Sequence, residues 1–172
     1  MKYEEALKEI KSTDKGILSE CKKKWDSLAK PLNSLGQLES LVAKIGSAQG
    51  TSNVKLSKRR VLVFCSDNGV VEEGVSQSDH SVTTAVAKAL AEGTSNVNIF
   101  AGHANCDVGV FDVGMIDDLD MEGLKIDKVC HGTRNLAKEP AMTKDEAIHA
   151  VEVGINAALK SKSDETRKMS AL

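Results

Sequence analysis

Two short apolar runs, separated by room for two helices, constrain the fold of this 172-residue chain more than any other feature. The first spans Arg60–Ser66 and the second Asp107–Gly114, and both are continuous and β-branched in type. Such runs are typical of strands buried in a parallel sheet. The segments between them, Ser81–Ala91 and Ser95–Ala104, suit helices. We therefore predict a β-α-α-β unit whose parallel strands end at one edge of the sheet, where α/β folds bind ligands.

The chain on either side of this unit is less regular. Three helical stretches, at 3–11, 16–28 and 35–45, precede it, and a polar linker places a boundary near residue 58. After it comes a weaker strand, Lys125–Cys130, and then a helix that starts at Thr143 with a capping box.

These elements predict an α/β fold with a partial doubly wound, Rossmann-like and mostly parallel sheet, preceded by a small helical segment. We expect the helical segment to span 1–57 and the partial α/β domain to span 58–160. Residues 161–172 have no apolar period, which predicts a disordered or frayed tail.

Composition excludes several classes of protein. The chain is 41% hydrophobic, 28% charged and 3% aromatic, an ordinary globular mixture. The formal net charge of −2 and the scarcity of aromatic residues argue against a nucleic-acid partner, so we expect the basic runs to be solvated. The chain has neither a long apolar span nor a signal-like start, so we expect no membrane partner and a cytoplasmic location.

Cysteine and histidine spacing predicts no metal site and no disulfide framework. The four cysteines lie far apart, and no C-x-x-C pair occurs. His103 and Cys106, and the adjacent Cys130 and His131, are the only metal-like pairs, and neither has a second pair at zinc spacing. We expect the cysteines to be buried thiols.

Two loops carry candidate binding residues, and each has two interpretations. The loop 66–78, with Asp67 and Asn68, can hold a polar small molecule, or it can form an Asx-turn with solvated glutamates. The loop 131–135, with Arg134 and Asn135, suits a phosphate or carboxylate, or Arg134 can bridge structural elements.

Other catalytic patterns are absent or unsuitable. The consecutive residues Asp79, His80 and Ser81 carry the letters of a hydrolase triad, but neighbours on one helical turn cannot face one another in those roles. No nucleophile elbow, P-loop or dinucleotide-binding glycine motif occurs in the chain.

Four colinear motifs resemble those of the nicotinate-nucleotide:dimethylbenzimidazole phosphoribosyltransferase family, over about residues 25–160. They lie at Lys30–Glu39, Asp67–Ser76, Phe111–Gly114 and Gly132–Thr143. Asn33 stands where the family usually has glycine, Asp79 where a proline is common, and Val86 where one branch has a glutamine near the base.

The resemblance implies transfer of phosphoribose from nicotinate mononucleotide to a benzimidazole nitrogen, as in cobalamin lower-ligand synthesis. It implies small-molecule substrates, no metal or organic cofactor, a homo-oligomer, and a site at the carboxyl ends of the strands. The resemblance also implies that Ser78 lies at a position where the family lines the pocket for the base. We take Ser78, Asp67, Asn68, Arg134 and Asn135 as candidate substrate-binding residues.

The family's general-base glutamate and its phosphate-binding turn lie beyond the part that this chain resembles, so we assign no catalytic residue. Two hypotheses follow. The chain is a truncated transferase with little or no activity alone. Alternatively, it is a non-catalytic binding module that retains benzimidazole-like ligands, or a half-enzyme that pairs with a separate C-terminal half.

Overall fold

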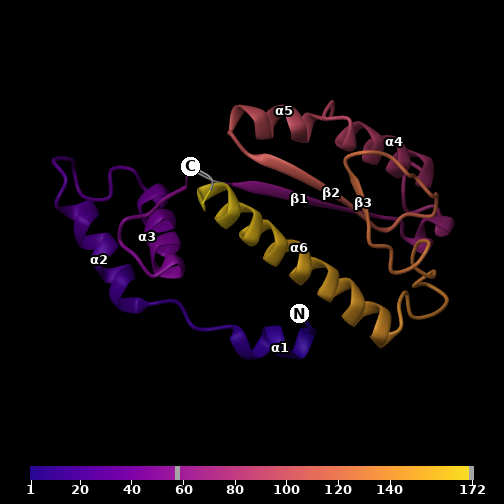
Figure 1. Ribbon diagram of the computed structural model, residues 1–172, viewed down its shortest axis with the longest axis horizontal. Helices are drawn as coiled ribbons and strands as arrows, with labels where there is room; N and C mark the ends of the chain where they lie inside the picture. Colours follow the sequence, from indigo (N-terminus) through magenta and orange to yellow (C-terminus); the bar gives the residue numbers. More distant parts are fainter. Residues whose placement is uncertain (57–58, 171–172) are drawn as a thin grey trace. The chain divides into compact units, whose positions relative to one another are not determined.

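The computed structural model describes residues 1–56 and 59–170, and it gives side chains for residues 1–56 and 59–162 (Figure 1). The chain divides into two compact units: residues 9–57, and residues 1–8 together with 58–172. The first eight residues thus belong with the α/β unit and not with the helical segment. The short helix α1 (Tyr3–Glu9) begins there, and Glu152 binds both the Lys2 ammonium and the Tyr3 amide at 3.0 Å.

The helical unit contains α2 (Lys15–Asp26) and α3 (Gln37–Gln49), close to the predicted bounds. Asp14 caps α2, accepting hydrogen bonds from the amides of Gly16 and Ile17 at 2.7 and 3.0 Å. The Ser47 hydroxyl of α3 donates to the Asp14 carbonyl oxygen at 2.6 Å, which ties the two helices together.

The turn between these helices explains the departure at Asn33. Asn33 has φ of +56°, a left-handed conformation that glycine adopts freely and asparagine tolerates better than other residues do. Nearby, the Lys30 ammonium lies 2.7 Å from the Glu39 carboxylate, with both side chains mostly buried. The hydrogen bond from Lys30 lowers the pKa of Glu39.

The α/β unit is built on a three-stranded sheet in the order β1-β2-β3. Both strand pairs are parallel, as the sequence predicts. Strands β1 (Arg60–Ser66) and β2 (Asp107–Gly114) have the predicted bounds. The register shifts after Cys65, so that a bulge in β2 lies at the carboxyl end of the pair.

The predicted third strand is shorter and slightly earlier than the sequence suggests, because β3 spans only Leu124–Ile126. Beyond it, the Asp127 and Val129 amides still donate to β2 carbonyl oxygens, at 2.9 and 3.0 Å. Lys128, between them, turns its ammonium inward to the buried Asp112 carboxylate at 3.2 Å.

Helices α4 (His80–Ala91) and α5 (Asn96–His103) lie on one side of the sheet, and α6 (Lys144–Ser170) lies on the other (Figure 1). The core between sheet and helices is formed by apolar residues of β1, β2, β3, α4 and the loop after β2: Cys65, Ala87, Leu90, Val110, Met115 and Leu124. Burial of these side chains fixes α4 against the sheet and thereby places its N-terminus beside the strand ends.

Helix α6 begins with the predicted capping box. The Thr143 amide donates to the Glu146 carboxylate at 2.6 Å, and the Glu146 amide donates to the Thr143 hydroxyl at 3.2 Å. The backbone of residues 161–170 continues this helix, where the sequence predicts a frayed tail; residues 171–172 lie outside the described part. That segment lacks glycine and proline and is rich in good helix formers, so a helix needs no apolar stripe to continue.

None of the helices in the described ranges is long and apolar enough to cross a membrane.

Candidate functional site

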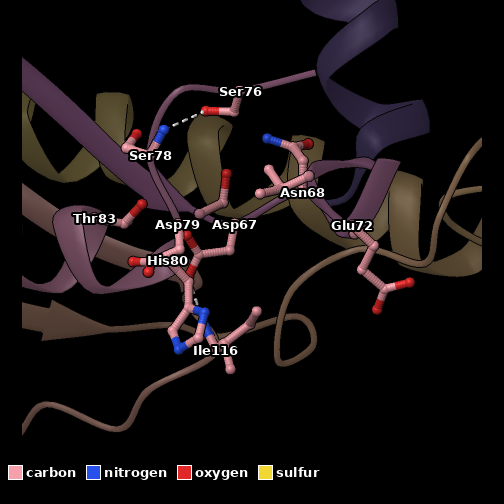
Figure 2. A pocket seen from close by; sticks show the side chains of 12 residues that line it. Asp67, Asn68, Glu72, Ser76, Ser78, Asp79, His80, Thr83 and Ile116 are labelled. Carbon is pink, nitrogen blue, oxygen red and sulfur yellow. Dashed lines mark hydrogen bonds between the residues drawn. The ribbon is translucent and has the colours of Figure 1, made fainter. Parts of the chain in front are cut away.

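A pocket of about 640 Å³ lies at the carboxyl ends of β1 and β2, the edge that the sequence predicts for ligand binding (Figure 2). Its walls come from the loop after β1, the first turns of α4 and the loop after β2. The lining residues are Ser66, Asp67, Asn68, Gly69, Val71, Glu72, Ser76, Ser78, Asp79, His80, Thr83 and Ile116. Three of the five candidate residues, Asp67, Asn68 and Ser78, are among them.

Asp67 joins the loops that follow the strands. Its amide donates to the Gly114 carbonyl oxygen at 3.0 Å, and its own carbonyl oxygen accepts from the Thr133 amide at 3.0 Å. Asp67 is 5% exposed, and its carboxylate accepts from the Ile116 amide at 2.8 Å. Asp67 therefore fixes the pocket floor as well as lining it.

Gly69 is required by a close backbone approach. A Cβ atom built on it would lie 2.5 Å from the Thr133 carbonyl oxygen and 2.8 Å from backbone atoms of the next two residues. The Gly69 amide donates to the Thr133 hydroxyl at 3.2 Å. Only glycine allows the first loop to pack on the second in this way.

The wall opposite contains Ser76, Ser78 and Asp79. The Ser78 amide donates to the Ser76 hydroxyl at 3.2 Å, a contact drawn in Figure 2. Asp79, at the position where proline is common in the family, caps α4 by accepting from the Ser81 amide at 2.9 Å. Hydrogen bonds from the Ser81 hydroxyl and amide lower the pKa of Asp79, so this wall carries a negative charge.

A short 3-10 helix, η1 (Gly69–Glu73), follows the first strand and was not expected from the sequence. The side-chain amide of Asn135 donates to the Glu73 carboxylate at 2.6 Å, and the Lys138 ammonium lies 3.1 Å from the same carboxylate. These two hydrogen bonds lower the pKa of Glu73. Asn135 thus holds the η1 turn and lies outside the pocket lining.

Arg134 also lies outside the pocket lining. Its guanidinium pairs with both carboxylate oxygens of Glu146 on α6, and its Nε donates to the Pro140 carbonyl oxygen at 3.2 Å. The hydrogen bonds from Arg134 and then from Thr143 lower the pKa of Glu146 to about 2. Of the two interpretations left open for Arg134, the contacts match the bridging one.

The charge of the pocket is one-sided. Three carboxylates, those of Asp67, Glu72 and Asp79, line it, and the lining contains no lysine or arginine among the described residues. Such a lining favours a neutral or cationic ligand over an anion such as a phosphate.

The sequence gives no signal for the side chain that lies against His80. The His80 Nε2 atom lies 3.9 Å from a carboxylate oxygen of Asp117, which is in the loop after β2. The Ser81 hydroxyl binds Asp79 instead, so the three consecutive residues do not act as a triad. Only the tertiary packing of α4 on the sheet brings His80 and Asp117 together.

Neither metal ligation nor disulfide bonding is found in the described part. All four cysteines are free; Cys21 and Cys65 are buried, as predicted, while Cys106 and Cys130 are half-buried. Burial, followed by the charges of Asp112 and Asp67, raises the pKa of the Cys65 thiol. Within residues 1–56 and 59–162, no group of three or more potential ligands is placed to hold a metal ion.

A parallel open sheet flanked by helices, with a pocket at its carboxyl edge, defines a Rossmann-like α/β protein. The model of a family described as "Phosphoribosyltransferase" matches residues 10–170. The chain belongs to this phosphoribosyltransferase family, which confirms the resemblance read from the four motifs.

Individual relatives agree with this assignment. A protein of Clostridium acetobutylicum named nicotinate-nucleotide–dimethylbenzimidazole phosphoribosyltransferase is 39% identical over 162 residues, which are 94% of this chain and 46% of the relative. A protein of the same name from Acetivibrio thermocellus is 43% identical over 88% of this chain and 43% of its own length. The crystal structure of the Thermus thermophilus enzyme of that name superposes with a TM-score of 0.82 at 36% identity, covering 88% of this chain and 46% of that one. The chain spans about half the length of the relatives it matches.

Proposed function

We propose that this chain carries the base-binding part of a site that transfers phosphoribose from nicotinate mononucleotide to 5,6-dimethylbenzimidazole or a related base. The products are α-ribazole 5′-phosphate and nicotinate. The observation that carries the proposal is the pocket at the carboxyl edge of β1 and β2, which is lined by three carboxylates and, within the described residues, by no lysine or arginine. The relatives' names supply the reaction.

The charge of the pocket suits the charge that develops on the base. One ring nitrogen bonds to the anomeric carbon while the bond from that carbon to the nicotinate nitrogen breaks, and its electron pair goes to nicotinate. Positive charge grows on the azole until its N–H proton is lost, and carboxylates near the ring stabilise that charge. The substrate phosphate needs cations, which this pocket lacks, so we place the phosphate site elsewhere.

The candidate residues then divide by role. Ser78 and Asn68 contact the base, while Asp67 holds the floor of the pocket and contributes charge. Arg134 and Asn135 position the second loop through Glu146 and Glu73. No general base is assigned, and a cytoplasmic location remains a prediction.

Calorimetry and product analysis test the proposal together. We expect 5,6-dimethylbenzimidazole to bind the purified chain, and we expect no release of nicotinate when nicotinate mononucleotide is added. Ser78→Trp should abolish binding by filling the pocket, while Val82→Trp, at an exposed position of α4 outside the lining, should leave binding intact. Absence of heat with every benzimidazole would overturn the proposal. Normal release of nicotinate would overturn the idea that this chain carries only the base-binding part of the site.

A second candidate function is that of a half-enzyme that associates with a separate polypeptide. Strand β1 is at the edge of the sheet, and Val61 and Phe64 on it are 36% and 42% exposed. An open edge with apolar side chains is a place where another strand adds. We expect the chain alone to form dimers or larger species at this edge.

Light scattering distinguishes the self-associated chain from a complex with a separate polypeptide. A fragment of the Clostridium acetobutylicum relative beyond the matched part, when added, should convert the self-associated chain into a one-to-one complex. Phe64→Glu should weaken both associations, because it places a charge on the edge strand. A monodisperse monomer that ignores the fragment contradicts this second candidate.

A further inference from the structure

His80 occupies a defined place in the pocket. It is the first residue of α4 and lies beside Asp67, Asp79 and Ile116 (Figure 2). Its Nε2 atom faces the Asp117 carboxylate at 3.9 Å. The second oxygen of that carboxylate accepts a hydrogen bond from the Thr84 hydroxyl at 2.8 Å, one turn further along α4. Asp117 is therefore held in place beside the imidazole.

This arrangement selects one form of the imidazole. A carboxylate accepts and cannot donate, so Asp117 favours the tautomer that carries its proton on Nε2. The Nδ1 atom is then an acceptor, and in the described part of the chain no hydrogen bond engages it. At 3.9 Å the two atoms lie beyond hydrogen-bond distance, and contacts of this kind in unliganded sites commonly tighten only when a ligand binds.

The carboxylates of the pocket already have protein partners. The Asp67 carboxylate accepts from the Ile116 amide, Glu72 pairs with Lys138 at 3.4 Å, and Asp79 accepts from the Ser81 amide. His80 Nδ1 is thus a neutral acceptor that a ligand can satisfy without displacing a protein partner.

We propose that His80, positioned by Asp117, is the residue that recognises the N–H group of the base. The inference rests on the proposed function and extends it, because it specifies a planar azole with a free N–H. A base of the same shape that lacks this hydrogen presents a lone pair of its own to the His80 Nδ1 lone pair, so the hydrogen bond is lost. Because His80 is half-exposed, one lost hydrogen bond predicts a preference of about tenfold and not the much larger factors of buried sites.

Benzimidazole and benzoxazole provide the matched probes. They share shape and the second ring nitrogen, but benzoxazole has an oxygen in place of the N–H group. Calorimetry is run at about pH 8, where a histidine side chain is ordinarily neutral. We expect the chain to bind benzimidazole about tenfold more tightly than benzoxazole.

Variants separate recognition from folding. His80→Ala should bring the ratio of the two affinities close to one, mainly by weakening benzimidazole, and His80→Gln should restore part of it through an amide oxygen. Asp117→Asn should lower the ratio while His80 is still present, because an amide no longer fixes the tautomer. His103→Ala, at the exposed end of α5, is the control and should leave the ratio unchanged.

Each remaining outcome is decisive. If His80→Ala still folds by circular dichroism, still binds benzimidazole and keeps the original ratio, the role of His80 is refuted and the proposed function stands. If the unsubstituted chain binds neither probe nor 5,6-dimethylbenzimidazole, the proposed function fails and the inference fails with it. An unchanged ratio in Asp117→Asn removes the positioning role of Asp117.

Discussion

Replacing Gly69 by alanine tests the contact between the two loops that build the pocket. The new Cβ would lie 2.5 Å from the Thr133 carbonyl oxygen, roughly 0.9 Å inside ordinary van der Waals contact. The three atoms nearest to this Cβ are all backbone atoms, so a side-chain rotation cannot relieve the clash. The loop must move, and the hydrogen bond from the Gly69 amide to the Thr133 hydroxyl lengthens from 3.2 Å.

The expected magnitude follows from these two effects. Overpacking of this kind costs about 1–3 kcal/mol, and loss of one hydrogen bond adds about 1 kcal/mol. A domain of this size loses roughly 2–4 °C in melting temperature per kcal/mol, so we expect a decrease of about 10 °C in thermal unfolding followed by circular dichroism. Because Gly69 lines the pocket, binding of benzimidazole should weaken in the same variant.

Gly102→Ala is the matched control. Gly102 is in α5, and a Cβ there meets nothing within 4 Å. The substitution should raise the melting temperature slightly, since alanine is the better helix former by up to about 1 kcal/mol. If Gly69→Ala melts at or above the temperature of the unsubstituted chain, the close approach of the loops is not as described.

Two further substitutions probe ion pairs of the α/β unit. The Glu146 pKa is lowered to about 2 by Arg134, so the ionised pair stabilises the fold above the ordinary carboxyl pKa and loses that effect as pH falls. Glu146→Gln should therefore melt lower than the unsubstituted chain near neutral pH, and the difference should close between about pH 4.5 and pH 2; a difference independent of pH contradicts this. Lys128→Met leaves the fully buried Asp112 without its cation and should cost about 3–5 kcal/mol in urea unfolding, part of which Asp112→Asn restores in the double variant. Equal stability of the single and double variants would show that the pair is not the cause.

Much of the fold could be predicted because the signals are local. Apolar runs gave β1 and β2 with their bounds, and the spacing of Thr143 and Glu146 gave the start of α6. The bounds of β3 were less predictable, because the chain beyond Ile126 still donates hydrogen bonds to β2 while Lys128 reaches Asp112. Residues 161–170 had no stripe to detect, although their composition suits a helix.

The site was less predictable because its contacts join distant parts of the chain. Asp67 and Ser78 were found from the strand end and from the family resemblance, and both line the pocket. Arg134 was equally suited to a substrate anion or to a protein carboxylate, and only the position of α6 brings Glu146 to it. The contact between His80 and Asp117 required the packing of α4 on the sheet, which no local pattern reports.

The backbone bonds under the pocket also affect how quickly its amide protons exchange with solvent. The amides of Asp67, Gly132 and Thr133 lie beyond the strand ends, yet they donate to carbonyl oxygens of Gly114 and Asp67. Protons held in this way exchange when the sheet opens and not when a loop fluctuates, so they should persist in deuterated water as long as those of β2. A floor with that local stability is organised before the ligand arrives, and binding then costs little ordering entropy.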